Sequence, residues 1–298
     1  MDFCLLAYSE QFHLQTKVLE YLGILKEIST QLGVPFTHMD YALIEDFDDG
    51  KGVSNEDALI EDYDDDVGIS NETNINPESI NLLQKKLKDK HIFELAVWSL
   101  EDEKNENSPD NIHAEVLEIN PNAGYKYAYI HFPIKRIESL GPEALFTFVS
   151  NLVSSLNNLG RLDYALVAIM KPDMPQTYFR DIFAPGLNED EAANLAMWNR
   201  REGERKIRLR GLYWGNLLGC NHLLRLADQN AFKQSVENLV GRDQITTING
   251  DDLFFMQPFS NHQSGVKFDK IKELLIENDL LMQPNEEDIR EARRFLSY

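Results

Sequence analysis

The stretch FCLLAYSEQFHLQTKVLEYLGILKEISTQLGVP, residues 3–35, predicts how the fold begins. Its first part, Phe3–Tyr8, is a compact apolar run of strand length. From His13 to Leu32 the apolar residues recur at helical spacing, as at Val18, Leu19, Leu22, Leu25 and Ile28. Gly33–Pro35 then marks a break in the pattern. The sequence therefore predicts a strand that is followed at once by a helix.

The remaining apolar patterns predict an α+β fold. Strands are expected at residues 92–100, 114–119, 125–132, 163–170, 244–248 and 252–256. Helices are expected at residues 78–90, 142–159, 188–199, 222–228, 231–239, 268–278 and 285–296. We predict a layered protein with mixed or antiparallel sheets and helices packed on one face. It divides near residue 160 into an N-terminal half, 1–160, and a similarly sized C-terminal half, 161–298, and the two halves are compatible with one compact domain.

Composition restricts the function more than the fold. The 298 residues include 50 acidic and 29 basic side chains, which gives a formal charge of −21, and 43% are hydrophobic. Nucleic acid is excluded as the expected ligand, because phosphate binding needs clustered cationic side chains. An acidic protein is also repelled by anionic membranes and attracts basic proteins. The plainer interpretation, that the charge only keeps the protein in solution, stays open at this point.

The ends of the chain and its cysteines predict a cytoplasmic protein. Cys4 and Cys220 are the two cysteines, and their spacing matches neither a metal site nor a CxxC motif. Asp2 stands where a secretory signal would be basic, and the apolar stretch after it is far shorter than a signal core. No apolar run approaches the roughly 18 to 20 residues that span a bilayer, so we expect no membrane association.

A tandem repeat interrupts the N-terminal half. Residues 42–57 read ALIEDFDDGKGVSNED and residues 58–73 read ALIEDYDDDVGISNET, so eleven of the sixteen positions are identical. Two copies are too few for a solenoid, and we interpret the repeat as a duplication within a surface insertion at 42–73. Between Asp40 and Glu78 fourteen acidic residues accompany one basic residue, Lys51, which places a charge of −13 out of −21 here. This concentration favours a local electrostatic role.

The acidic clusters of the two repeats are our candidate partner contacts, with one aromatic residue in each copy as an anchor. These residues are Asp46, Phe47, Asp48, Asp49, Asp62, Tyr63, Asp64, Asp65 and Asp66. The spacing of three aspartates in the second copy resembles the start of an EF-hand loop, but Val67 replaces the glycine of the turn and Thr73 replaces the final glutamate. We therefore predict no metal site, and keep an acidic calcium-responsive adaptor as an alternative.

Motifs for catalysis and cofactor binding are missing from the sequence. It contains no GxxxxGK[ST], GxGxxG, HExxH or GxSxG. His131 stands between aromatic strand residues and with a nearby carboxylate would suit a hydrolase, although a partly buried structural histidine is the simpler interpretation. We predict no catalytic residue, no cofactor and no enzymatic activity, with an unrecognised hydrolase as the alternative.

The segment Arg208–Gly219 is the most distinctive apolar stretch. Its centre consists of Tyr213, Trp214, Gly215 and Asn216. Glycines beside a large ring let backbones approach closely, so we interpret these four residues as a structural motif of the core, with a ligand or partner contact as the alternative. Arg208 and Arg210 are candidates for ion pairs in the same layer.

Two segments of the C-terminal third, RGLYWGNLLGCNHLLRL (210–226) and LLMQPNEEDIREARRFL (280–296), resemble a known family. They are similar to bacterial immunity proteins of polymorphic-toxin and type VI secretion systems, nearest to the immunity protein 52 family. The resemblance implies an α+β protein that binds and neutralises a cognate toxin, often a nuclease, by covering its active surface. A nuclease toxin is basic where it binds nucleic acid, which suits an acidic inhibitor. The toxin and the oligomeric state stay open.

Overall fold

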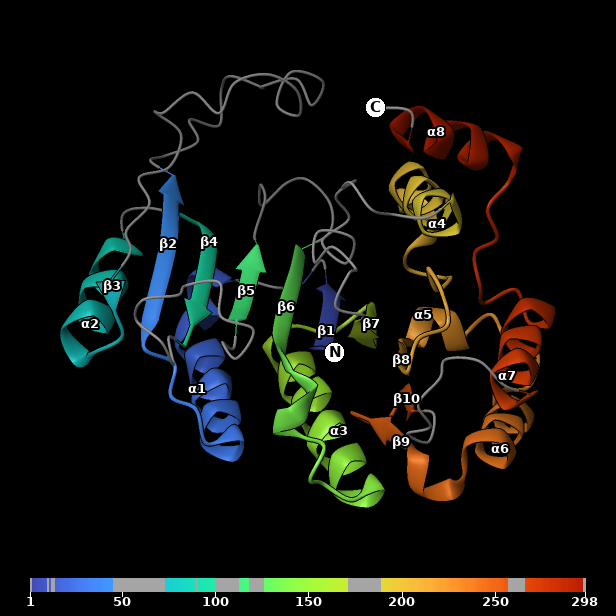
Figure 1. The fold of residues 1–298 in the computed structure, drawn as a ribbon, viewed down its shortest axis with the longest axis horizontal. Coiled ribbons are helices and arrows are strands. Elements are labelled where there is room, and N and C mark those ends of the chain that lie inside the picture. The colour runs from blue at the N-terminus through green and yellow to red at the C-terminus, as the bar shows by residue number, and fades with distance from the viewer. Residues whose placement is uncertain are drawn as a thin grey trace.

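The computed structural model describes residues 2–9, 11, 14–44, 73–88, 91–99, 113–117, 126–170, 189–256 and 266–296. Within them ten strands form one sheet in the order β3-β2-β4-β5-β6-β1-β7-β8-β10-β9, and every neighbouring pair is antiparallel (Figure 1). The strands are β1 (Asp2–Ser9), β2 (His38–Ile44), β3 (Thr73–Asn74), β4 (His91–Trp98), β5 (His113–Leu117), β6 (Lys126–Pro133), β7 (Tyr164–Met170), β8 (Gly215–Leu218), β9 (Ile245–Ile248) and β10 (Asp252–Met256).

Helices connect and cover these strands. They are α1 (Leu14–Leu32), α2 (Pro77–Lys86), α3 (Pro142–Leu159), α4 (Glu189–Arg200), α5 (Cys220–Leu223), α6 (Gln229–Val240), α7 (Val266–Glu277) and α8 (Glu286–Leu296). Figure 1 shows α4, α6, α7 and α8 gathered at the β7–β10 end of the sheet. The predicted α+β class and the antiparallel sheet are confirmed. No helix of the described ranges is both long and apolar enough to cross a bilayer.

Local signals in the sequence set several of these boundaries. Helix α3 follows Gly141, has Pro142 in its first turn and ends before Gly160, because proline fits the start of a helix and glycine its end. At the start of α2, Asn76 and Ser79 form a capping box: the Ser79 amide donates to Asn76 Oδ1 at 2.9 Å, and the Asn76 amide donates to Ser79 Oγ at 3.0 Å. These bonds satisfy amides that have no partner within the helix.

Strand β1 lies in the middle of the sheet and is buried on both faces. It pairs with β6 on one side and with β7 on the other, so that Tyr8 lies opposite both Tyr127 and Tyr164. A strand that is covered on both faces is apolar at every position rather than at alternate ones. This is why the opening run of the sequence is continuously apolar.

Helices cover both faces of the sheet, which corrects the expectation of helices on one face. Phe3, Leu5 and Ala7 belong to a first apolar cluster that includes the buried sides of α1 and α3. Cys4 and Leu6 alternate with them and belong to a second cluster, which includes residues of α4, α6 and α7. Successive strand residues point to opposite faces, so an unbroken apolar strand needs a helix layer on each side.

The expected division near residue 160 falls between α3 and β7. Strand β1 from the first half and β7 from the second half are direct neighbours, paired from Asp2↔Met170 to Tyr8↔Tyr164. The two segments therefore share a single sheet within the described residues. The division into halves stays a prediction.

Candidate partner-binding face

The acidic insertion begins and ends at one edge of the sheet. Strand β2 ends at Ile44, and the short edge strand β3 returns at Thr73 to pair with the start of β2, where Met39 lies opposite Thr73. The predicted partner contacts between Asp46 and Asp66 lie outside the described residues. Both attachment points thus belong to paired strands, and the pairing of β2 with β4 shifts register between Ala42 and Leu43, where the insertion begins.

The strands beside this insertion have one apolar face and one mixed face. Met39 and Tyr41 of β2, with Leu95 and Val97 of β4, belong to the first apolar cluster. The alternating positions on the opposite face are His38, Asp40, Ala96 and Trp98, which are all half-buried. In register, His38 lies opposite Trp98 and Asp40 lies opposite Ala96. We call these four residues the Trp98 platform.

Two rings form the centre of the Trp98 platform. The imidazole of His38 stacks on the indole of Trp98 with 5.9 Å between centroids and 14° between planes. Thr37 holds the pair in place, because its Oγ1 is 2.7 Å from His38 Nδ1 and its amide donates to the Trp98 carbonyl at 3.0 Å. Trp198 and Trp214 are only 0% and 5% exposed. Of the three tryptophans, Trp98 is thus the one that is only half-buried.

His131, which is the base in the hydrolase alternative, lies near the centre of the sheet. It is 8% exposed, lies opposite Cys4 of β1 and stacks on Tyr129 with 6.2 Å between centroids. Burial raises the pKa of the Cys4 thiol strongly, and the lowering effects of Tyr129 and the Arg210 charge are smaller. A thiol that stays protonated is a poor nucleophile, so this pair of residues does not favour cysteine catalysis.

The thiols give a direct test of this packing. Cys4 is fully buried, whereas Cys220 is half-buried at the first position of α5. We expect a thiol reagent such as DTNB to modify Cys220 in the native protein, and Cys4 more than about 100-fold more slowly, because reaction needs an accessible thiolate. The Cys220→Ser and Cys4→Ser variants identify the two sites. Equal rates for both thiols before unfolding would contradict the buried position of β1.

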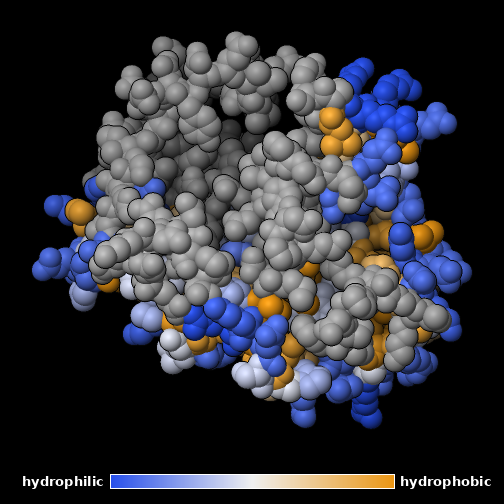
Figure 2. Space-filling model, in the orientation of Figure 1, coloured by the Kyte–Doolittle hydropathy of each residue, from blue (hydrophilic) through white to orange (hydrophobic). Residues whose placement is uncertain are grey.

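Several arginines at the end of α4 and in the segment after it are paired with carboxylates. Arg200 Nη1 lies 3.2 Å from Asp288 Oδ1, and Arg201 also pairs with this carboxylate. Arg208 binds Asp279 through two bonds, Nε to Oδ1 at 3.0 Å and Nη2 to Oδ2 at 2.7 Å. The surface around α8 is accordingly strongly hydrophilic (Figure 2). These arginines join α4, α7 and α8, and their carboxylate partners reduce the positive charge that an anion would need.

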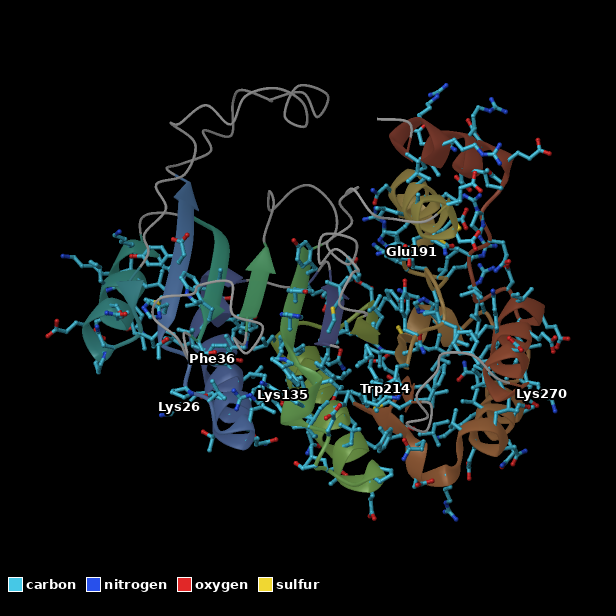
Figure 3. The ribbon with its side chains drawn as sticks, viewed as in Figure 1. Lys26, Phe36, Lys135, Glu191, Trp214 and Lys270 are labelled. Atoms are coloured by element: carbon cyan, nitrogen blue, oxygen red, sulfur yellow. The ribbon has the colours of Figure 1, made fainter. Side chains whose placement is uncertain are left out.

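The motif Tyr213, Trp214, Gly215 and Asn216 lies in the core. The Tyr213 amide donates to Asn216 Oδ1 at 3.1 Å, and Asn216 Nδ2 donates to the Tyr213 carbonyl at 2.8 Å. Trp214, labelled in Figure 3, belongs to the first apolar cluster. A Cβ at Gly215 would come within 3.1 Å of Met256 and Val167, so the glycine lets three strands pack closely.

A second buried polar group lies where α3, β7, β8 and β10 meet. Asp252 is 1% exposed, and its carboxylate receives Asn157 Nδ2 at 3.4 Å and faces Arg161 Nη2 at 3.5 Å. Burial raises the pKa of Asp252, and Arg161 offsets part of that effect. Asn157 Oδ1 also accepts the Leu162 amide at 2.6 Å. These bonds tie the end of α3 to the sheet, which is a structural role.

Metal-binding geometry is not found within the described ranges, where no three His, Cys, Asp or Glu side chains are grouped as ligands. The calcium alternative concerned the repeats, which lie outside those ranges.

Comparison with known proteins leaves the family open, since no protein family matches the chain and no curated protein is significantly similar to it. Segments 210–226 and 280–296 adjoin each other in the fold. Leu209, just before the first, forms a parallel bridge with Leu281 of the second: its amide donates to the Leu280 carbonyl at 2.7 Å, and the Met282 amide donates to the Leu209 carbonyl at 2.9 Å.

Proposed function

We propose that the protein is a cytoplasmic inhibitor that binds a basic protein partner through the acidic insertion between β2 and β3. The resemblance of residues 210–226 and 280–296 to immunity proteins supports a particular form of this function, in which the partner is a cognate bacterial toxin. The inhibitor would cover the toxin's cationic active surface. The observation that carries the proposal is the charge of −13 between Asp40 and Glu78, attached at a single edge of the sheet.

Electrostatics explains why this arrangement suits binding. Charges of one sign that are concentrated at one place raise the rate at which an oppositely charged partner associates. The basic segment at 200–210 does not oppose this effect strongly, since several of its arginines are paired with Asp279 and Asp288. The acidic insertion and the paired arginines belong to opposite ends of the sheet order. A basic partner is therefore steered towards the β2–β3 edge.

The first experiment is co-expression with the product of the adjacent reading frame in bacteria. We expect the neighbour to stop growth when it is expressed alone, and this protein to restore growth and to co-purify with it. A harmless neighbour, or toxicity that this protein does not relieve, would contradict the immunity function.

Neutralising the acids of the repeats tests how binding works. Changing the seven aspartates of the two clusters to asparagine should lower the association rate constant about 10-fold at low salt, since steering depends on their charge. Stopped-flow or surface-plasmon measurements at several salt concentrations provide the rates. The matched control neutralises seven exposed acids elsewhere in the protein, namely Glu27, Glu138, Glu143, Asp269, Glu273, Glu277 and Glu286. If both variants associate as slowly as each other, net charge alone is responsible and the insertion has no special role.

A further inference from the structure

Strand β9 stands at the end of the sheet order. Within the described residues it pairs with β10 alone (Figure 1). In an antiparallel ladder alternate residues turn their amides and carbonyls to opposite sides, so part of the backbone of β9 faces away from β10. Apart from this ladder, the one hydrogen bond that the described part of the chain gives to β9 is to a side chain, from Lys233 Nζ to Thr247 Oγ1 at 2.9 Å. The outer edge of β9 therefore has backbone groups for a further strand.

The sequence of β9 lacks the usual protection of an edge strand. Sheet edges are commonly guarded by a lysine or a proline within the strand, or by a bulge. β9 reads Ile-Thr-Thr-Ile, with no charge and no proline, and its pairing with β10 has no register shift. The side chain of Thr247 is exposed. An unguarded edge of this kind is a favourable place for pairing with another strand.

The strand is complementary to itself about a two-fold axis. When two copies of Ile-Thr-Thr-Ile pair antiparallel about their centre, Ile245 lies opposite Ile248 of the second copy, and Thr246 lies opposite Thr247 of the second copy. Threonines that face each other in this way can form hydrogen bonds across the strands. The sequence therefore matches apolar with apolar and hydroxyl with hydroxyl at every position of the strand.

Opposite charges flank the strand at matching distances. Arg242 stands three residues before β9 and Asp251 three residues after it, so the same register sets each of them against the other in the second copy. Their side chains are 93% and 72% exposed. Within the chain, Arg242 Nε lies 4.0 Å from Glu237 and Asp251 Oδ2 lies 3.7 Å from Arg161, and exposed ion pairs contribute little. Both charges can thus act between copies at small cost.

The distribution of charge also allows this pairing. Two copies that each carry a formal charge of −21 repel each other most where their acids are concentrated. The acidic insertion is attached at β2 and β3, at the other end of the sheet order from β9. Across ten strands this separation is about 40 Å along the sheet, several times the Debye length in physiological salt. Pairing through β9 keeps the two insertions far apart.

We propose that the outer edge of β9 pairs with the same edge of a second copy of this chain, which joins two sheets into one. Two-fold interfaces of this self-complementary kind are the commonest in protein oligomers, and strand addition at an edge derives its affinity from main-chain hydrogen bonds. The inference does not depend on the proposed function. It adds to that function a dimer with one acidic insertion at each end.

Sedimentation velocity and hydrogen exchange test the pairing. We expect a dimer whose population rises with protein concentration up to about 100 µM. The amides of Ile245–Ile248 should exchange more slowly at high than at low concentration, because the edge gains hydrogen-bond partners. A protein that stays monomeric, or a dimer that forms without added protection of β9, would overturn the inference. Slow exchange in β9 at every concentration would overturn it as well, by showing that another segment of the same chain covers the edge.

Charge reversal tests the register. Arg242→Glu and Asp251→Arg each set like charges against each other, so either variant alone should dimerise about 10-fold more weakly than the wild type. An equimolar mixture of the two variants should recover the wild-type affinity, because the mixed dimer has opposite charges at both ends. Each variant should melt within a few degrees of the wild type, since both positions are exposed. A mixture that dimerises as weakly as the separate variants would overturn the two-fold pairing.

Discussion

Replacing Asp288 with alanine is expected to lower the free energy of unfolding by about 2 kcal/mol, because the change removes a buried carboxylate that accepts charged hydrogen bonds from two partly exposed arginines. Asp288 is 1% exposed and pairs with Arg200 and Arg201 of the α4 end. It also accepts the Asn285 amide at 2.9 Å, which begins α8. The loss should lower the melting temperature by roughly 5 °C for a protein of this size. Urea unfolding followed by circular dichroism measures the change.

The neighbouring residue provides the control. Glu287 also pairs with Arg200, at 2.6 Å, but its side chain is 66% exposed. Exposed ion pairs contribute little to stability, so Glu287→Ala should unfold almost like the wild type. A similar loss in both variants would show that α8 is held by its total charge rather than by the buried carboxylate.

Acid should destabilise the protein through His222, which is 0% exposed. Burial lowers the pKa of His222 from 6.5 to about 4, the Arg225 charge adds to this, and the carbonyls of Arg208 and Gly219 only partly offset it. The folded protein keeps this ring neutral while the unfolded chain takes up a proton below about pH 6.5, so stability is lost as the pH falls. Between pH 7 and pH 4 the loss should be about 3 kcal/mol from this residue.

The variant His222→Gln isolates this contribution, since glutamine does not titrate. Its free energy of unfolding should depend less on pH between 6.5 and 4 than that of the wild type. Asp252 acts in the opposite direction, because burial raises its pKa and the folded state takes up its proton first as the pH falls. Parallel pH curves for the variant and the wild type would show that His222 is not held neutral in the fold.

Much of the fold could be predicted from the sequence, because the spacing of apolar residues within a single segment indicates whether it forms a strand or a helix. The continuous run at Phe3–Tyr8 and the helical spacing after it predict β1 and α1. Strand β2 is absent from the prediction, since its alternation at Met39 and Tyr41 merges into the first repeat. The second helix layer was not expected either. The sequence signal for this layer lies in β1. Cys4, Leu6 and Tyr8 are apolar although they point to the face opposite that of Phe3, Leu5 and Ala7.

The candidate site was less accessible to sequence reasoning. Charge counting identifies the insertion, because acids are visible in any alignment of the two repeats. The Trp98 platform depends on register, since His38 and Trp98 are far apart in the chain and meet only when β2 pairs with β4. The ion pairs of Arg208 with Asp279 are equally long-range, although Arg208 was a candidate for pairing. Composition gives the charge of a segment, whereas contacts between distant strands need the fold.

The central place of β1 makes the order of synthesis important. This strand is synthesised before both of its partners, which are β6, ending at Pro133, and β7, ending at Met170. Bringing such distant segments together is slow because a long loop must close before the pairing contributes. Until residue 133 has been made both edges of this apolar strand are open to other nascent chains, and the edge that pairs with β7 stays open until residue 170. Strand β1 is therefore expected to be the segment most open to aggregation while the rest of the sheet is being made.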